Sequence, residues 1–303
     1  MLLKKSYTCM VLLSSLLFVG CSKGGNTVTP DPTPPTPVAK NIPISLACGI
    51  SSRASETGFD NNDKIGLFVV NYNNGSATSL QLIGNHADNL CFTYNGSWTP
   101  DKTIYWKDET TKADFYVYYP YTTLSSLNAQ SFSVKENQAT LDNYKGSELL
   151  WGKATGISPT ESAVNITTNH VLSAAAIKVV AGSGFTAESL AAANVSVKLN
   201  GLKVGATLDL STGVVTATGD AKSIVPYKDS DTYRAIIVPQ AVAEGNLITV
   251  TVDGRDYNLK KAFTFEAGKR HTFTVTVIKT SEGINVTINS WKDDGTDNGG
   301  TAV

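Results

Sequence analysis

The chain has 303 residues, of which 41% are hydrophobic and 17% are charged, and its formal net charge is -1. These values are typical of globular proteins, and the length allows two domains of ordinary size. So small a net charge gives no electrostatic footprint for nucleic acid or for an acidic membrane surface, so we expect no nucleic-acid partner.

The first twenty residues have the form of an export signal. Two lysines precede the apolar run Cys9–Phe18, which is too short to span a bilayer. The segment Leu17–Cys21 resembles the lipobox of bacterial lipoproteins. We therefore expect residues 1–20 to be a lipoprotein signal peptide and Cys21 to carry palmitate-type acyl chains, several of which hold a protein firmly on a membrane. The alternative is an ordinary secretory signal with an incidental cysteine.

Residues 21–41 are predicted to be a tether. Five prolines lie between Pro30 and Pro37, interleaved with Thr and Asp. Such a segment cannot bury apolar surface and stays extended in the polyproline form. It would be a stalk between the lipid anchor and the downstream domains.

The next segment, residues 42–50, has the two-residue period of a strand with one buried face. Its apolar positions are Ile42, Ile44, Leu46, Cys48 and Ile50. Pro43 cannot donate a ladder hydrogen bond, which places the strand at the edge of a sheet. An edge strand can be lost without dividing a sheet, so we interpret this strand as the temporary occupant of a groove.

A protease site follows this strand. Arg53 is the first arginine of the chain, it lies in the small polar run Ser51–Ser55, and the next arginine is Arg234. A trypsin-like cut between Arg53 and Ala54 would separate residues 42–53 from everything downstream. The alternative is a solvated loop arginine with no such role.

Two cysteines remain in the mature chain, Cys48 and Cys91. Isolated cysteines of an exported protein can pair, and a disulfide would keep the strand tethered after a cut at Arg53. We therefore expect both cysteines to be free and buried as small apolar groups.

From Lys64 onward the chain is a succession of short apolar runs separated by Gly, Asn and Asp, which predicts an all-β fold of antiparallel sandwiches. A polar interval with Pro159 suggests two domains, at 42–158 and 159–303, the second ending in a polar tail. Helix is expected only at Thr186–Ala193, and as a single turn at Leu124–Ala129. Three tight hairpin turns are predicted, at Asn95-Gly96, Ser211-Thr212-Gly213 and Asp253-Gly254.

Several motifs together resemble the fimbrillins, the type V pilus subunits of the Bacteroidales. The motifs are Ile65–Phe68, Ile104–Trp106, Ala113–Tyr121, Ser147–Gly152, His170–Ser173, Ala181–Gly184, Leu208–Gly213, Ile237–Gln240 and Gly268-Lys269 before Phe273. The resemblance runs from about Arg53 to Trp291, and the order of the motifs is more specific than any one of them.

This resemblance implies a fold, a route of processing and a mode of assembly. It implies two tandem transthyretin-like β-sandwich domains and a surface-exposed lipoprotein precursor on the outer membrane. It also implies processing after Arg53 by a trypsin-like surface protease and transfer to a fimbrium. The partners would be other fimbrillin subunits, each filling the opened groove of its neighbour with a strand.

In this family the donor strand usually comes from the carboxy terminus. Ile284, Val286 and Ile288 alternate with polar residues and form our candidate donor strand. The same alternation permits the strand to close its own domain instead.

The best rival interpretation is a surface glycan-binding lipoprotein that stacks sugars on aromatic rings. The run Phe115–Tyr121 supplies such rings, but its alternation suits a central strand covered on both faces. An exposed, coplanar set among Trp98, Trp106 and Tyr118 would favour the glycan interpretation.

No catalytic, cofactor-binding or metal-binding residues are predicted, so we expect a protein that is not an enzyme. Gly182–Ala187 fits the dinucleotide-binding spacing, but the helix after it is too short for a βαβ unit, which leaves a pair of loop glycines. His86, His170 and His271 lack neighbours at metal-ligand spacing. Residues 293–300 resemble the start of a calcium loop without its glutamate, and are interpreted as part of the tail.

Overall fold

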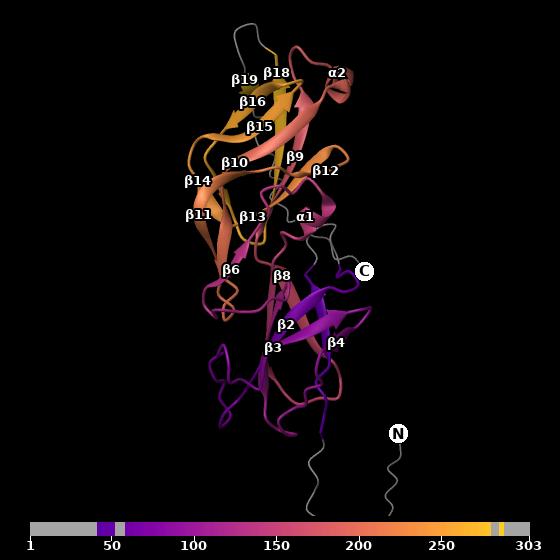
Figure 1. The fold of residues 1–303 in the computed structure, drawn as a ribbon, viewed down its shortest axis with the longest axis vertical. Helices are drawn as coiled ribbons and strands as arrows, with labels where there is room; N and C mark the ends of the chain where they lie inside the picture. The colour runs from indigo at the N-terminus through magenta and orange to yellow at the C-terminus, as the bar shows by residue number, and fades with distance from the viewer. Residues whose placement is uncertain (1–40, 52–57, 280–284, 288–303) are drawn as a thin grey trace, which may run out of the picture. The chain divides into compact units, whose positions relative to one another are not determined.

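The structure is a computed structural model that describes residues 41–51, 58–279 and 285–287. Short strands dominate it, as the short apolar runs predict (Figure 1). Two groups of strands enclose separate apolar cores, and we call them the N-terminal lobe and the C-terminal lobe. The fold is therefore all-β, as predicted.

The N-terminal lobe is built on one seven-stranded sheet. In spatial order its strands are β1 (Leu46–Ile50), β8 (Val164–His170), β7 (Leu150–Ile157), β5 (Ala113–Tyr119), β2 (Lys64–Asn71), β3 (Ala87–Tyr94) and β4 (Trp98–Pro100). The two ends of this order, β1 and β4, are the edge strands. Pro43 precedes β1 and makes only an isolated bridge with Tyr105, so the predicted edge position of this strand is confirmed.

The central strands of this sheet are covered on both faces. In β2, Ile65, Leu67 and Val69 belong to the core of the N-terminal lobe. Phe68 and Val70 point the other way and belong to the apolar core of the C-terminal lobe. Residues 113–118 of β5 are all buried, which confirms the central strand predicted for the aromatic run.

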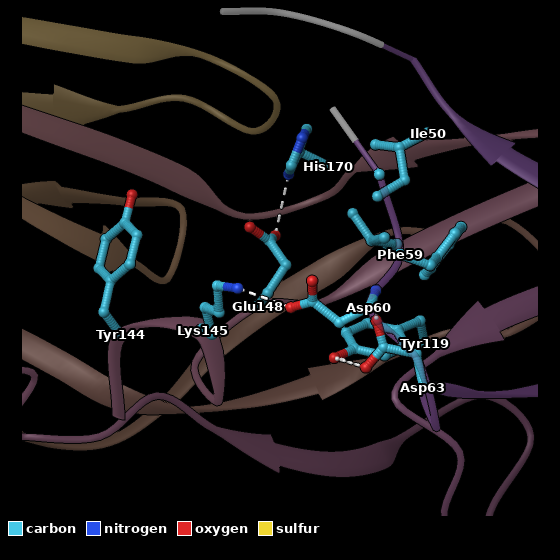
Figure 2. A pocket seen from close by; sticks show the side chains of 11 residues that line it. Ile50, Phe59, Asp60, Asp63, Tyr119, Tyr144, Lys145, Glu148 and His170 are labelled. Atoms are coloured by element: carbon cyan, nitrogen blue, oxygen red, sulfur yellow. Dashed lines mark hydrogen bonds and ion pairs between the residues drawn. The ribbon is translucent and has the colours of Figure 1, made fainter. Parts of the chain in front are cut away.

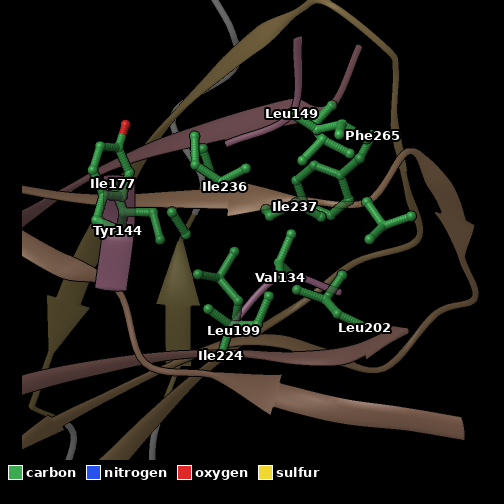
Figure 3. Packing of buried hydrophobic residues seen from close by; sticks show 14 of the residues in the cluster. Val134, Tyr144, Leu149, Ile177, Leu199, Leu202, Ile224, Ile236, Ile237 and Phe265 are labelled. Atoms are coloured by element: carbon green, nitrogen blue, oxygen red, sulfur yellow. The ribbon is translucent and has the colours of Figure 1, made fainter. Parts of the chain in front are cut away.

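The C-terminal lobe is a sandwich of two sheets. One sheet has the order β11 (Val215–Ile224), β10 (Val195–Leu208), β15 (Asn246–Val252) and β16 (Arg255–Lys260). The other has the order β12 (Tyr227–Asp229), β13 (Thr232–Ile237), β9 (Ser173–Ala181), β18 (Arg270–Ile278) and β19 (Asn285–Thr287), and β14 (Gln240–Val242) pairs with β17 (Phe263–Phe265). Leu199 from one sheet and Ile177 and Ile236 from the other share one core, which Figure 3 shows from close by.

The boundary predicted between residues 158 and 159 is not where the sheets divide. Strand β8 lies after that boundary but pairs with β7 and β1 of the N-terminal sheet. Strand β6 (Gln130–Ser133) lies before it but pairs with β10 of the C-terminal lobe (Figure 1). The polar interval around Pro159 is the loop between β7 and β8, because a loop inside a sheet has the same composition as a linker between domains.

Each lobe contains one parallel strand pair, and the other pairs between the described strands are antiparallel. In the N-terminal lobe β1 runs parallel to β8, and in the C-terminal lobe β18 runs parallel to β9. Each of these pairs joins two strands that lie far apart in the sequence. Only Val171 and Leu172 separate β8 from β9.

The predicted turns are confirmed, and the helix predictions are mixed. All three hairpins join antiparallel neighbours, and Gly96, Gly213 and Gly254 have the positive φ that their turns require. Helix α2 (Ala187–Ala192) begins after Thr186, whose side chain caps it. The turn predicted at Leu124–Ala129 is wrong, and α1 (Leu141–Lys145) was not predicted.

The incorrect helix has a local explanation. The backbone amide of Ser125 donates to the side-chain oxygen of Gln130, and the amide of Ala129 donates to the hydroxyl of Ser126. Side chains that satisfy backbone donors in this way compete with helical hydrogen bonds.

Candidate functional site

Strand β1 is the best candidate for a functional element, and it lies in a parallel register on β8. The paired positions run from Leu46 opposite Val164 to Ile50 opposite Thr168. Ile44, Leu46 and Cys48 are buried in the core of the N-terminal lobe. The two ends of the predicted apolar series, Ile42 and Ile50, are half-buried.

The backbone of β1 is paired on one side only. The amide of Val164 donates to the carbonyl of Ser45, and the amide of Ser51 donates to the carbonyl of Thr168, each at 2.8 Å. Odd-numbered residues of β1 therefore face β8, and even-numbered residues turn their backbone groups away from it. On the β8 side, the Thr168 hydroxyl adds a 3.0 Å hydrogen bond to the carbonyl of Gly49.

A single side chain closes the other side of β1. The indole Nε1 of Trp98, in the opposite edge strand β4, donates to the carbonyl oxygen of Cys48 at 2.9 Å. Phe59 packs edge-on against the Trp98 ring at a centroid distance of 4.8 Å and an angle of 80°. We call the space that β1 occupies between β8 and Trp98 the β1 slot.

The beginning of this segment is held by loop backbone. The amide of Ile44 donates to the carbonyl of Ile104, and the amide of Trp106 donates to the carbonyl of Ile42, each at 2.9 Å. Ile104 and Trp106 belong to one of the motifs singled out in the sequence. That motif therefore forms the seat of the residues that lead into β1.

The predicted processing and lipidation residues, Cys21, Arg53 and Ala54, lie outside the described residues. Ser51 and Gly58 bracket the undescribed residues 52–57, so Arg53 follows β1 directly along the chain. Of the candidate donor strand, Ile284 and Ile288 also lie outside the described residues. Val286 lies in β19, whose backbone pairs antiparallel with β18 of its own lobe. This pairing agrees with the alternative in which the strand closes its own domain.

Cys48 and Cys91 are both free and buried. Burial raises the pKa of the Cys48 thiol from 9.0 to about 12, and the Thr168 hydrogen bond offsets the shift only in part. Burial also raises the pKa of the Cys91 thiol. The thiol of Cys48 is therefore protonated and unreactive at neutral pH while β1 is in its slot.

A pocket of about 360 Å³ lies at the carboxyl end of β1, lined in part by Ile50, Gly58 and Phe59 (Figure 2). Its polar walls are already paired. The imidazole of His170 lies 3.0 Å from the Glu148 carboxylate, the ammonium of Lys145 lies 2.6 Å from Asp60, and the Tyr119 hydroxyl donates to Asp63 at 3.1 Å. We infer no catalytic or ligand-binding chemistry from groups so paired.

The aromatic residues that would favour glycan binding are buried. Trp98, Trp106 and Tyr118 are 8%, 5% and 2% exposed, so they offer no stacking surface to a sugar. The Tyr118 hydroxyl donates at 2.6 Å to the side-chain oxygen of Asn89 inside the lobe. These aromatic residues serve the core and the β1 slot.

The remaining motifs meet where the two lobes join. The indole of Trp151 donates at 2.8 Å to the carbonyl of Leu210, and Gly213 lies so close to the Trp151 ring that a Cβ there would be 2.5 Å from a ring carbon. The amide of Gly268 donates at 2.7 Å to the carbonyl of Leu172. Residues far apart in the sequence thus form one junction.

The glycine pair predicted to be a loop has a packing role. A Cβ on Gly182 would lie 2.7 Å from a methyl group of Thr276, and one on Gly184 would lie 2.7 Å from Lys279. Among the described residues there is no group of three or more His, Cys, Asp or Glu side chains that could hold a metal ion. The same part of the chain contains no helix long and apolar enough to cross a membrane.

Comparison with known proteins gives consistent matches. The family model described as "Fimbrillin-like" matches residues 52–291. A Bacteroides uniformis protein named "Putative fimbrium subunit Fim1C" is 28% identical over 95% of this chain and 96% of its own length.

Solved structures share the fold. A Bacteroides uniformis protein described as a "putative cell adhesion protein" superposes with a TM-score of 0.61 at 24% identity, covering 82% of this chain and 97% of its own. A fimbrial protein from Bacteroides ovatus gives a TM-score of 0.52 at 22% identity, covering 78% of this chain and 49% of its own. With the family model matching most of its length, the chain belongs to the fimbrillin-like family.

Proposed function

We propose that this protein is a structural subunit of a cell-surface fimbrium. It is made as a lipoprotein precursor acylated at Cys21 and anchored in the outer membrane. A trypsin-like surface protease cuts it between Arg53 and Ala54, and β1 then gives up its slot to a strand of another subunit. The name of the Bacteroides uniformis relative supports the assembly with other fimbrillin subunits.

The observation that carries the proposal is the attachment of β1. It is an edge strand whose backbone pairs with β8 alone, and the candidate cleavage segment follows it directly. Its apolar side chains nevertheless complete the core of the N-terminal lobe. A cut therefore releases a strand that can leave without dividing the sheet.

The burial free energy that is lost when β1 leaves explains why another strand would fill the empty slot. Burying an aliphatic side chain such as Ile44 or Leu46 contributes roughly 1.5–3 kcal/mol. Loss of β1 thus removes a large part of the roughly 5–15 kcal/mol that stabilises a domain. A strand of similar alternation restores this burial, and backbone pairing with β8 supplies the affinity.

The candidate donor is the strand around Val286. β19 is the edge strand of its sheet, and its described residues pair with β18. An edge strand can leave without dividing a sheet, so β19 can be exchanged in the same way as β1.

The test is limited trypsin digestion of the purified precursor, with Arg53→Gln as the matched control. We expect the wild type to be cut first after Arg53 and to form oligomers on size-exclusion chromatography, while Arg53→Gln remains monomeric. A wild-type protein that is cut, loses residues 42–53 and stays an equally stable monomer would refute the proposal.

A further inference from the structure

The two parallel strand pairs of this protein lie in series along the chain. β1 pairs with β8 over five positions, and β9 pairs with β18 over eight positions from Ala174 to Ala181. Val171 and Leu172 are the only residues between β8 and β9. A continuous path therefore runs from the amino end of β1 to the carboxyl end of β18 through two parallel pairs.

The direction of the strands decides how this path responds to tension. When one strand of a parallel pair is pulled at its amino end and the other at its carboxyl end, the strands must slide past each other along their axes. The hydrogen bonds of such a pair are evenly spaced along it and so share the force. An antiparallel hairpin pulled at its open end instead loses its bonds one after another.

We propose that these two pairs make the protein a tension-resisting element. Force that enters at the amino end of β1 leaves β8 at its carboxyl end and enters β9 at its amino end. It leaves β18 at its carboxyl end once β19 has been pulled off β18. Both pairs are thereby loaded in shear. The biological use of this property rests on the proposed function, because a donor strand lying in the β1 slot in the direction of β1 would load the same path. The mechanical property itself belongs to the single chain.

Further hydrogen bonds strengthen the path at both pairs. In the first pair, Thr168 binds the carbonyl of Gly49 and Trp98 binds the carbonyl of Cys48. In the second pair, the hydroxyl of Ser173 donates at 3.2 Å and the amide of Ala174 donates at 2.9 Å to the carbonyl of Lys269, just before β18. The first pair has fewer paired positions, so we expect it to yield first.

Single-molecule force spectroscopy on the uncut chain, held at its two termini, tests this inference. Loss of the β1–β8 pair, followed by detachment of β6 from β10, frees the roughly 110 residues between Ile50 and Val164, which extend by about 400 Å at about 3.6 Å per residue. Loss of the β9–β18 pair frees the roughly 90 residues between Ala181 and Arg270, which extend by about 300 Å. We expect two separate force peaks, and the one followed by the longer extension should come first.

Two proline variants distinguish damage to the force path from damage to the rest of the fold. The amide of Ala47 faces β8 in the same alternation as Ser45 and Ser51, and its side chain is exposed. Ala47→Pro should lower the force of the 400 Å event and leave the 300 Å event unchanged, whereas Ala47→Thr should change neither. Ala221→Pro, in the exposed edge strand β11 outside the path, should lower the melting temperature without changing either force.

Thr168→Val keeps the backbone ladder and removes only the hydrogen bonds of the hydroxyl, to the Gly49 carbonyl and the Cys48 thiol, so it replaces Ala47→Pro if that variant does not fold. It should weaken the 400 Å event by a smaller amount. The inference is overturned if either variant leaves that force unchanged, or if Ala221→Pro lowers it as much as Ala47→Pro does. Because the measurement uses one uncut chain, its outcome does not depend on cleavage at Arg53 or on polymerisation.

Discussion

The indole nitrogen of Trp98 donates a 2.9 Å hydrogen bond to the carbonyl oxygen of Cys48, and this bond connects the two edge strands of the N-terminal sheet. The sheet curls so that its first and last strands in spatial order approach each other around one core. On one side the backbone of β1 is hydrogen-bonded to β8, and on the other side it is hydrogen-bonded to the side chain of Trp98. The attachment of β1 is therefore asymmetric, and Trp98 is the residue that a substitution can remove without touching the ladder.

Trp98→Phe should speed the release of β1 from the cut subunit. The substitution leaves the Cys48 carbonyl without its partner, which costs about 1–3 kcal/mol for a buried group. The release rate can be measured by mass spectrometry of the freed peptide after trypsin treatment. Trp151→Phe is the matched control, since it also removes an indole donor from a carbonyl, which in this case belongs to Leu210 of the C-terminal lobe. Equal release rates in the two variants would show that Trp98 does not hold the strand.

The thiol of Cys48 should report whether the slot is filled. Its pKa is raised to about 12 by burial, so a maleimide or disulfide reagent at pH 8 should label it slowly in the intact protein. After the cut and displacement of β1 by an excess of the 42–51 peptide carrying Cys48→Ser, which has no thiol of its own, labelling should become fast. The variant should carry Cys91→Ala so that only one buried thiol is present. Fast labelling of the uncut protein would contradict a buried, stably held β1.

The same shift makes the stability of the lobe depend on alkaline pH. Because the folded-state pKa lies above the ordinary value of 9.0, the protonated thiol stabilises the fold fully below pH 9, and this contribution is lost as the pH rises toward 12. Cys48→Ala should show a smaller loss of melting temperature than the wild type between pH 9 and pH 10.5, measured in one buffer series. Equal losses of melting temperature in the two proteins would show that Cys48 does not cause the pH dependence.

Gly213→Ala should damage the junction between the lobes. Its φ is +76°, and an added Cβ would lie 2.5 Å from Trp151, whereas Gly219 has a φ of +78° with nothing within 4 Å. Both substitutions carry the backbone penalty, but only Gly213→Ala adds a clash, which should make it about 1–3 kcal/mol more destabilising, as overpacking typically is. Combining it with Trp151→Ala should remove the extra cost. Similar losses at both glycines would contradict the close packing.

Much of the fold follows from local patterns in the sequence. The alternation from Ile42 to Ile50 predicts the buried face of β1, and Pro43 predicts its edge position. The hairpin turns follow from Gly and Asn, which accept positive φ. The capping residue Thr186 predicts α2, but α1 has only five residues and too little periodicity to be recognised.

What the sequence does not reveal is which strands become partners. Residues 130–133 lie between strands of the N-terminal sheet, yet they pair with β10. Gln138 is similar, because its buried side chain binds both the amide and the carbonyl of Ile236, 98 residues away. The contact between Trp98 and β1 could not be predicted either, because no residue near Trp98 or Cys48 in the sequence indicates that the two edges of the sheet meet. Such long-range pairings depend on the closure of the whole sheet.

Val286→Asp should block assembly without unfolding the monomer if this strand is the donor. A charge is costly in an apolar slot, whereas β19 lies at the edge of its own sheet, where its pairing with β18 does not hold other strands in place. We expect a normal melting temperature and no polymer after cleavage at Arg53. Thr287→Asp, on the other side of the alternation, should polymerise as the wild type does. A Val286→Asp monomer that melts far below the wild type would instead make the strand a fixed part of its own lobe.

Amino-terminal sequencing of the protein in fimbriae sheared from the cell surface tests whether the working subunit has lost β1 through a cut at Arg53. We predict that the chain in the polymer begins at Ala54, while the chain extracted from the membrane begins at an acylated Cys21. A polymer whose subunits all begin at Cys21 and retain residues 42–53 would contradict it.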